Sequence, residues 1–479
     1  MKDYAEFLDK KKDRVEPVGF SVELDQLNDK LKPFQSAIVK WSLSRGRAAL
    51  FCDTGLGKTF MQLEWANHVC RKTDMPVLIF APLAVAPQTV TEAEKFGIKS
   101  QVKVVANQDE CISGINVTNY DKMHHFDASK FSGLVLDESS ILKNYTGRTR
   151  NELIKFARTI NYRLACSATP APNDIMELAN HSEFLDAMSG KEIIANYFIQ
   201  DGNTAHKWRL KKHAEGPFWE FVSTWSIAVR KPSDIGFDDA GYILPEPVYH
   251  EHVVSSKIND GFLFPMQANT MGERRKARSE SIDDRCKMVA EIVAKEPDKQ
   301  WLIWCDLNAE SELLKKLIPN SIDVKGSDKN EFKEKNLLGF KDGKPQNLIS
   351  KPSICGHGMN WQHCSRMVFV GLSDSFEKMY QGKRRIWRFG QEENVHIHVV
   401  TAESEGAVVQ NIKRKERESN NMYNQIIKHM GTNDLYVQRT KRTEMEYSVN
   451  KKEGNNWVAY NGDSCEMLKE IDSDSVGLS

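Results

Sequence analysis

Short, continuous apolar runs recur along the chain, and stretches with helical periodicity separate them. One series lies at residues 48–52, 77–82, 101–105, 133–139 and 162–170, and a second lies at residues 300–306, 347–353, 366–373 and 394–402. The runs are rich in Val, Ile and Leu and do not alternate with polar residues, which is typical of strands in a parallel sheet buried on both faces. The pattern predicts an α/β fold with two parallel-sheet lobes in tandem.

The stretch between the two series has a different pattern. Residues 171–245 show helix-like periodicity around three tryptophans, which predicts a mainly helical insertion that returns to an extended linker near Leu-Pro-Glu-Pro. Residues 403–430 predict an amphipathic helix, and the polar residues 431–455 predict a linker. The expected segments are an N-terminal segment (1–30), the first lobe (31–170), the insertion (171–245), the linker and second lobe (246–402), the C-terminal helix and linker (403–455) and the start of a further domain (456–479).

Composition and charge limit the classes of function. The chain has 479 residues and equal numbers of basic and acidic residues, 66 of each, so any DNA-binding groove must be local. Candidate basic patches lie at 274–278, 383–385 and 413–417. A solvated helix face is the alternative for each, and we favour it for 413–417. No apolar stretch approaches the ~18 residues of a membrane span, and the N-terminus lacks an apolar signal core. The nine cysteines include no Cys-x-x-Cys pair, so we expect a cytoplasmic protein with reduced thiols and no membrane contact.

The strongest local signal is a glycine-bearing turn between an apolar run and a helix-like stretch, Asp-Thr-Gly-Leu-Gly-Lys-Thr at 53–59. Gly55 and Gly57 allow the backbone N–H groups to turn inward around phosphate oxygens, and the following helix points its positive end at the same anion. Lys58 is expected to reach the β- and γ-phosphates of ATP, and the Thr59 hydroxyl to bind Mg²⁺. The alternative is a glycine turn that only by chance ends in Gly-Lys-Thr, since Cys52 stands where the general pattern has its first glycine.

A pair of acidic residues follows a later apolar run, in Leu-Val-Leu-Asp-Glu-Ser-Ser. In a phosphate-loop ATPase the first carboxylate, here Asp137, holds Mg²⁺ through its water shell, and the second, Glu138, polarises the attacking water. The alternative is an Asp-Glu-Ser helix start that the helix dipole stabilises. The phosphate loop earlier in the chain favours the catalytic interpretation.

These motifs together resemble those of superfamily 2 nucleic-acid motors, and among them the Snf-type translocases of double-stranded DNA. The resemblance covers residues 31–402 and implies two RecA-like lobes with an ATP-binding first lobe and a helical protrusion after it. It implies that Gln35 in Leu-Lys-Pro-Phe-Gln reads adenine and that Thr54 belongs to the phosphate loop. Ser167 and Thr169, in Ser-Ala-Thr-Pro, would couple hydrolysis to lobe movement. Ser140 stands where the family has a histidine, which leaves the coupling role of that position open.

The segment Tyr-Gln-Gly-Lys-Arg-Arg-Ile-Trp-Arg-Phe-Gly-Gln, 380–391, resembles the family's arginine motif. The resemblance assigns Gln381 to coupling and Arg385 and Arg388 to ATP hydrolysis. Spacing of three residues would place both guanidinium groups on one helix face, from which they reach the γ-phosphate. Lys383 and Arg384 are equally compatible with DNA-phosphate binding.

The last two dozen residues resemble the opening of exocyclic-amino DNA methyltransferases. Residues 456–479 are compatible with a strand, a Gly-Asp turn, a helix and the start of another strand, without the Pro-Pro catalytic loop or the glycine motif for S-adenosylmethionine. This suggests a motor fused to a methyltransferase, of a kind suited to a phage or a restriction–modification system; the alternative is a folded tail.

The function expected from the sequence is ATP hydrolysis, with Mg²⁺, that duplex DNA stimulates and that drives movement along the duplex. One alternative is a helicase that separates DNA or RNA strands, but no strand-splitting wedge is identifiable. The other is a DNA-binding module without catalysis. Retention of Lys58, Glu138, Arg385 and Arg388 argues against that second alternative.

Overall fold

The computed structural model describes residues 16–83, 85–200, 208–255, 271–355, 359–430, 450–454 and 457–461. The chain divides into two compact units, Met1–Asn433 and Asp434–Ser479. In the second unit, β16 (Asn450–Gly454) and β17 (Trp457–Asn461) form an antiparallel pair. The strand predicted near 457–461 is therefore present, and β16 lies inside the stretch predicted to be a linker. The predicted Gly-Asp turn and helix after Asn461 lie outside the described residues.

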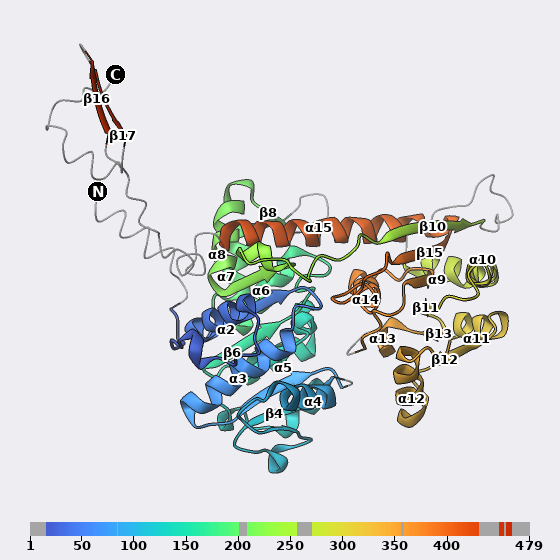
Figure 1. Ribbon diagram of the computed structural model, residues 1–479, viewed down its shortest axis with the longest axis horizontal. Coiled ribbons are helices and arrows are strands. Elements are labelled where there is room, and N and C mark those ends of the chain that lie inside the picture. The colour runs from blue at the N-terminus through green and yellow to red at the C-terminus, as the bar shows by residue number, and fades with distance from the viewer. Residues whose placement is uncertain are drawn as a thin grey trace. The chain divides into compact units, whose positions relative to one another are not determined.

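The first lobe is built on a seven-stranded sheet with the strand order β3-β4-β2-β5-β6-β1-β9 (Figure 1). Every neighbouring pair in this sheet is parallel. The strands are β1 (Arg47–Cys52), β2 (Val77–Ala81), β3 (Val102–Val104), β4 (Ile115–Asn119), β5 (Gly133–Asp137), β6 (Tyr162–Cys166) and β9 (Ser226–Val229). The helices of this lobe are α2 (Pro33–Arg45), α3 (Lys58–Thr73), α4 (Ala86–Phe96) and α5 (Arg148–Ala157).

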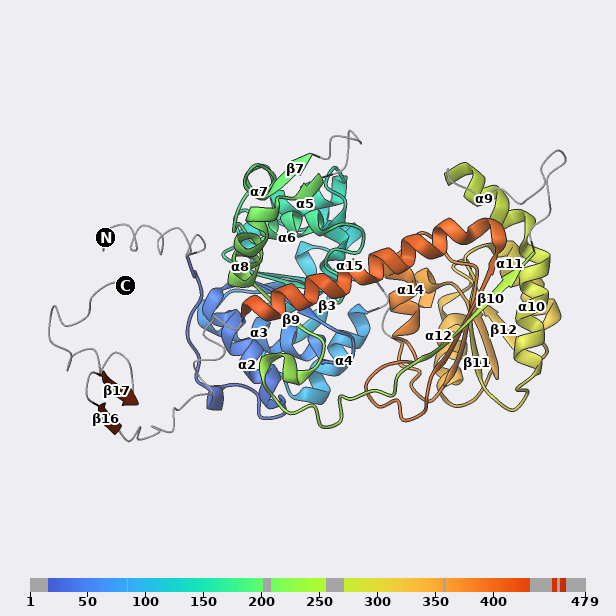
Figure 2. The same ribbon diagram turned by 90° about the horizontal axis from the view of Figure 1, so that it is seen from above.

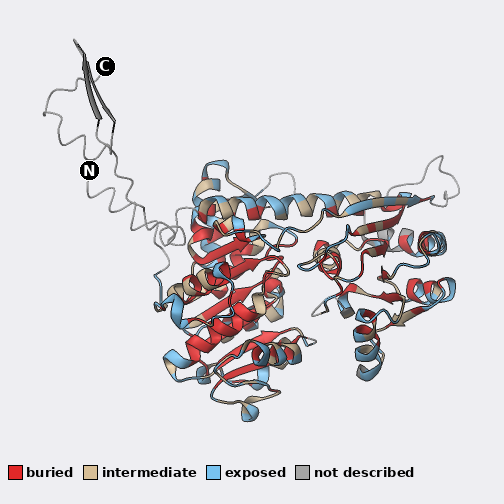
Figure 3. Cartoon of the chain, in the orientation of Figure 1, coloured by how far each residue is buried: buried red, intermediate tan, exposed pale blue. Residues whose placement is uncertain are grey.

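The central strands of this sheet are the core of the lobe, and Figure 3 shows them in the buried colour. All five residues of β2 and all five of β5 are buried, because helices cover both faces of the sheet. A continuous apolar run is stable as a strand only in such a place. The continuous apolar runs, which do not alternate with polar residues, therefore predicted these strands correctly.

The segment predicted to be a helical insertion contains α6 (Leu178–Phe184), α7 (Gly190–Tyr197) and α8 (Glu215–Trp225). It also contains a short antiparallel hairpin of β7 (Phe198–Gln200) and β8 (Trp208–Leu210). The segment ends by returning to the first lobe, since β9 pairs with β1. The sequence pattern did not indicate β9 as a strand of the sheet, because four residues directly after a helix carry no separate periodicity.

The second lobe contains a six-stranded sheet with the order β10-β15-β14-β11-β13-β12, again with parallel neighbours throughout. Its strands are β10 (Val248–Val254), β11 (Trp301–Trp304), β12 (Ser321–Val324), β13 (Asn347–Ser350), β14 (Arg366–Val370) and β15 (His396–Ala402). Its helices are α9 (Met271–Glu280), α10 (Ile282–Ala294), α11 (Asn308–Leu317), α12 (Asn330–Lys341), α13 (Pro352–Cys355) and α14 (Phe376–Lys383). Two parallel-sheet, RecA-like lobes in tandem, with a helical insertion after the first, confirm the predicted fold class.

Short 3-10 turns connect many of these elements. They lie at Leu24–Gln26, Gln108–Glu110, Tyr120–His125, Ala128–Lys130, Ser139–Lys143, Ile175–Glu177, Lys212–Ala214, Pro232–Ile235 and Glu403–Glu405.

The long helix α15 (Gly406–Met430) begins at the second lobe and ends against the first (Figure 2). Its second half packs on α8 and β9. There the Tyr423 hydroxyl donates a hydrogen bond of 2.9 Å to the carbonyl oxygen of Ala168. Its buried residues recur at helical spacing, as the amphipathic pattern of 403–430 predicted. The helix therefore connects the second lobe directly to the Ser-Ala-Thr segment of the first.

Four histidines are stacked on neighbouring strands β10 and β15. His250 lies 3.0 Å from His396, and His252 lies 3.0 Å from His398, measured between ring nitrogens. Burial, together with the other three histidines, lowers the pKa of His398 to about 3, although Glu296 opposes the shift. The folded state therefore keeps this ring neutral, while the unfolded chain takes up a proton below its ordinary pKa of about 6.5.

Because the unfolded state binds more protons in this window, stability is expected to fall as pH drops from about 6.5 toward 3. Between pH 7 and pH 5 we expect the parent protein to lose about 1 kcal/mol more free energy of unfolding than His398→Asn does. Urea unfolding at the two pH values measures this difference. His124→Asn, at an exposed histidine, is the control and should behave as the parent does. Equal pH dependence in parent and His398→Asn would contradict the prediction.

Within the described part of the chain, no helix is both long enough and apolar enough to cross a membrane. Seven cysteines in the same part are free thiols: Cys52, Cys70, Cys111, Cys166, Cys286, Cys305 and Cys364.

Candidate functional site

The motif-bearing segments of the first lobe follow three strands that are adjacent in the sheet, in the order β5-β6-β1. The strands are parallel, so their carboxyl ends lie at one edge of the sheet. This brings together the acidic pair after β5, the Ser-Ala-Thr segment after β6 and the phosphate loop after β1. Ligands bind in this position in open parallel sheets.

The phosphate loop has the backbone conformation that its glycines permit. Gly55 has φ +91° and Gly57 has φ +80°, in the left-handed region that side chains rarely adopt. Helix α3 starts at Lys58 directly after the loop, so its first N–H groups face the loop. The Lys58 ammonium donates hydrogen bonds to the carbonyl oxygens of Cys52 (2.8 Å) and Asp53 (3.3 Å). The loop therefore encloses a cation and a helix N-terminus, which suits a phosphate anion.

Gln35 lies against this loop. Its side-chain amide donates to the carbonyl oxygen of Leu56 at 2.8 Å, and its oxygen accepts from the backbone N–H of Lys32 at 2.9 Å. A Cβ atom added at Gly57 would lie 2.3 Å from the Gln35 amide nitrogen. Gln35 thus ties the start of α2 to the phosphate loop, and only glycine fits at position 57.

The acidic pair lies next to the loop in a buried, hydrogen-bonded setting. Asp137 accepts a 2.8 Å hydrogen bond from the Gln62 side chain, and burial, with the neighbouring Glu138 charge, raises its pKa to about 6. Glu138 has φ +58°, so the backbone turns sharply after β5. One Glu138 carboxylate oxygen lies 3.5 Å from the Ser167 hydroxyl. The hydroxyl oxygen of Ser167 in turn accepts from the backbone N–H of Thr169 at 3.0 Å.

Thr59 and Asp137 provide oxygen atoms suited to Mg²⁺, a cation that prefers carboxylate, hydroxyl and water ligands. Gln62, which bonds Asp137, is three residues after Thr59 on α3. Residues at that spacing share one helix face, so Thr59 lies on the face of α3 from which Gln62 contacts Asp137. The donor set fits the cation. When bound, Mg²⁺ would neutralise charge on the phosphates of ATP.

The two arginines predicted for hydrolysis lie beyond the end of a helix. Helix α14 ends at Lys383, so the interpretation that Arg385 and Arg388 share one helix face is wrong. Both nevertheless donate to the Met359 carbonyl oxygen, Arg385 at 3.1 Å and Arg388 at 3.4 Å, because the chain turns after α14. Arg385 also donates to the carbonyl oxygen of the buried Gln381 at 3.2 Å.

The second lobe reaches the phosphate loop through two residues that the sequence interpretation did not assign to the nucleotide site. The Arg384 guanidinium and the Tyr380 hydroxyl both contact the Asp53 carboxylate. Arg384 and Asp53 are 331 positions apart in the chain. The only sequence signal was the acidic residue at the start of the loop, which carries a charge that needs a partner.

A second contact between the lobes involves the first turn of α14. The Ser140 hydroxyl donates to the Glu377 carboxylate at 2.5 Å, and the Lys143 ammonium pairs with the same carboxylate. Ser140 stands where the resembled family has histidine. A short polar side chain thus still connects the acidic segment to the second lobe.

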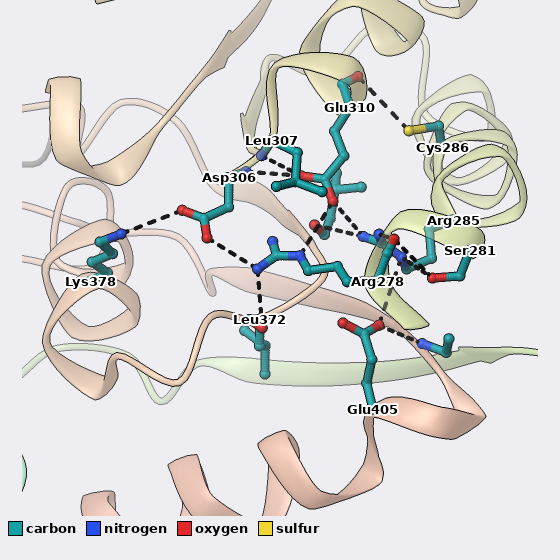
Figure 4. A network of polar contacts seen from close by, with 12 residues as sticks. Arg278, Ser281, Arg285, Cys286, Asp306, Leu307, Glu310, Leu372, Lys378 and Glu405 are labelled. Atoms are coloured by element: carbon teal, nitrogen blue, oxygen red, sulfur yellow. Dashed lines mark hydrogen bonds and ion pairs between the residues drawn. The ribbon is translucent and has the colours of Figure 1, made fainter. Parts of the chain in front are cut away.

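A network of charged residues in the second lobe is buried at Arg278, Arg285 and Glu310 and extends to α14 through partly exposed residues (Figure 4). Arg285, fully buried, donates to the carboxylate of the equally buried Glu310 at 2.8 Å. Arg278 donates to Asp306 at 3.0 Å, and Lys378 of α14 lies 3.5 Å from the same carboxylate. Pairing of this kind holds buried charges in place, because an unpaired one would be costly. Arg278 is therefore a structural residue and not part of a basic patch.

The patch expected at 383–385 is also buried. Lys383, Arg384 and Arg385 are 5%, 7% and 7% exposed. Lys383 contacts the hydroxyl of Tyr249 at 3.0 Å and the Glu416 carboxylate at 3.2 Å. Burial of Lys383 and Arg384 contradicts both alternatives left open for them, an exposed DNA-binding patch and a solvated helix face.

Comparison with known proteins finds similarity over the first lobe and the start of the insertion. Residues 34–189 match the family model of the SNF2-related domain. Over 182 residues the chain is 31% identical to the SWI/SNF-related matrix-associated actin-dependent regulator of chromatin subfamily A-like protein 1 of Xenopus tropicalis, which covers 35% of this chain and 18% of that protein. The chain thus spans about a fifth of the length of that relative.

Two further relatives match over most of their length. The putative protein p41 of Acyrthosiphon pisum secondary endosymbiont phage 1 is 22% identical, over 78% of this chain and 92% of that protein. The uncharacterized ATP-dependent helicase YqhH of Bacillus subtilis is 23% identical, over 74% of this chain and 72% of that protein. Residues 34–189 thus match an SNF2-related domain, and over most of its length the chain is similar to an ATP-dependent helicase, which supports ATP hydrolysis as its activity.

Proposed function

We propose that the chain hydrolyses ATP in response to duplex DNA and uses the hydrolysis to move along the duplex. The observation that carries the proposal is the contact of α14, and of the residue directly after it, with both parts of the proposed nucleotide site. Tyr380 and Arg384 contact Asp53, and Glu377 contacts Ser140. A nucleotide held at such an interface changes the contacts between the lobes when it binds and when it is hydrolysed. The resemblance to Snf-type translocases supports duplex DNA as the track.

In this proposal the residues of the first lobe bind ATP and activate the attacking water. Lys58 and the backbone of Thr54, Gly55 and Gly57 hold the phosphates, while Gln35 holds the loop next to the adenine. Thr59 and Asp137 hold Mg²⁺. Glu138, the second carboxylate of the acidic pair, polarises the attacking water, as the motif implies. Its carboxylate lies 3.5 Å from the Ser167 hydroxyl.

The residues that link hydrolysis to movement lie at the borders between the lobes. Ser167 contacts Glu138, and Thr169 donates to Ser167. The carbonyl oxygen of Ala168, between them, accepts from Tyr423 on α15. A movement of the Glu138 side chain during hydrolysis would therefore reach α15 through residues 167–169. Gln381 has the same coupling role in the second lobe, where it is buried and its carbonyl oxygen accepts from Arg385.

The larger protein context stays a prediction. Residues 34–189, which define the domain family, do not include the segment that resembles a methyltransferase. The β16–β17 pair belongs to a compact unit of its own and is compatible with either a fused domain or a folded tail.

The test is ATP turnover measured separately with duplex DNA, single-stranded DNA and RNA. Duplex DNA should stimulate turnover most, and binding should weaken steeply with salt while varying little with base sequence, because the contacts go to phosphates. Displacement of a third strand from a triplex, without separation of the duplex, measures movement. Separation of the duplex strands would favour the helicase alternative, which the name of the Bacillus relative also suggests. Stimulation by RNA alone would contradict the proposal.

A further inference from the structure

The phosphate loop contains a carboxylate, that of Asp53, at the site proposed for a triphosphate. The residue is 6% exposed. One carboxylate oxygen accepts from the Thr54 backbone N–H at 2.6 Å, so the group is fixed to the loop. The backbone N–H of Asp53 donates a hydrogen bond of 2.8 Å to the Val229 carbonyl oxygen. An ionised carboxylate in this position repels the phosphates of ATP unless a cation compensates it.

The compensating cation comes from the other lobe. Arg384, 7% exposed, pairs with the Asp53 carboxylate, and the Tyr380 hydroxyl donates to the same group. The guanidinium lies over the Trp387 ring at 4.2 Å and over the Tyr380 ring at 5.5 Å. These rings fix the orientation of the guanidinium toward Asp53. Burial lowers the pKa of Arg384 to about 9, which leaves it charged at neutral pH.

Arg384 differs from its two arginine neighbours in what it contacts. Arg385 and Arg388 bond the carbonyl oxygen of Met359, within the second lobe. Arg384 instead crosses to the first lobe. It is therefore available to balance Asp53 only while the second lobe is in contact with the phosphate loop.

We propose that Arg384 is a positioning residue that neutralises Asp53 across the lobe interface, so that the phosphate loop holds a nucleoside triphosphate tightly only when the lobes are closed. This inference rests on the proposed ATP site and deepens it. It makes triphosphate affinity depend on lobe contact without requiring Arg384 to touch the nucleotide.

The test is a double-mutant cycle with Asp53→Asn and Arg384→Gln. The readouts are affinity for a fluorescent ATP analogue without DNA, and separate kcat and KM values. Arg384→Gln should weaken affinity roughly tenfold or more, since coupling between paired groups commonly reaches that size. Asp53→Asn keeps the oxygen that accepts from Thr54, so it should stay within a few-fold of the parent. Asp53→Asn with Arg384→Gln should bind as Asp53→Asn does, because no carboxylate remains to be neutralised.

Two results would overturn the inference. If the double variant binds the analogue no better than Arg384→Gln alone, and Arg384→Gln also lowers kcat, Arg384 acts on the nucleotide itself. If Arg384→Gln binds the analogue more tightly than the parent, the pair is an inhibitory latch. If Arg384→Gln does not fold, the double variant still tests the inference, because weaker binding by the double variant than by Asp53→Asn alone would overturn it.

Arg148→Gln is the matched control, since that arginine is 90% exposed and pairs only with Glu152 among the ion pairs of the described residues. It should bind as the parent does. Affinity for the analogue is measured without DNA. If duplex DNA did not stimulate hydrolysis, that result would count against the proposed function, while the double-mutant cycle could still be interpreted. A parent protein that binds no ATP analogue would overturn both.

Discussion

Glu138→Gln should lower kcat for ATP hydrolysis by about three orders of magnitude while ATP still binds. Loss of a general base commonly costs ~10²–10⁴ in rate. A glutamine side chain has the same size as glutamate and can still accept a hydrogen bond from Ser167. It cannot polarise water as a carboxylate does. Single-turnover hydrolysis and retention of labelled ATP on a filter measure the two effects. Hydrolysis at the parent rate would remove Glu138 from the catalytic role.

Lys58→Ala provides the contrast to this variant. It removes the ammonium that contacts the carbonyl oxygens of Cys52 and Asp53, so ATP binding should be lost together with turnover. Glu138→Gln should therefore trap ATP where Lys58→Ala does not. If both variants lost binding equally, Glu138 would be a structural residue of the turn after β5.

Much of the first lobe was predictable because its signals are local. The phosphate loop, the acidic pair and Ser-Ala-Thr each follow a continuous apolar run, and these runs are β1, β5 and β6. Parallel strands then bring the three segments to one edge. Strand β10 was expected to be linker, because His250, Glu251 and His252 interrupt its apolar residues. An edge strand tolerates such residues, since much of it faces solvent.

The contacts between the lobes were not predictable in the same way. Arg384 was interpreted from its basic neighbours, which suggested a DNA surface, whereas its partner Asp53 lies 331 positions away. Ser140 was interpreted as a departure from a family pattern, and its partner Glu377 lies 237 positions away. Spacing along the chain identifies groups on one element. It does not identify which element of another lobe will face them.

The remaining prediction concerns Arg388, which the sequence assigns to hydrolysis. Its guanidinium contacts the Asn360 side chain and the Met359 carbonyl oxygen. Burial lowers the pKa of Arg388, while the charge of Glu92, on α4 of the first lobe, opposes the shift. The assignment of Arg388 to the γ-phosphate of ATP therefore rests on the resemblance of residues 380–391 to the family's arginine motif.

Arg388→Ala should therefore reduce duplex-stimulated kcat by about 10³-fold, the lower end for an arginine that neutralises charge in phosphoryl transfer. DNA affinity should stay within a few-fold, because in this prediction the guanidinium acts on the nucleotide and not on the DNA. The measurements are kcat at saturating ATP and DNA, and DNA binding by fluorescence anisotropy at two salt concentrations. Arg417→Ala, at an exposed arginine of α15, is the control and should retain kcat. Loss of DNA binding with normal basal turnover in Arg388→Ala would instead place this arginine in the DNA groove.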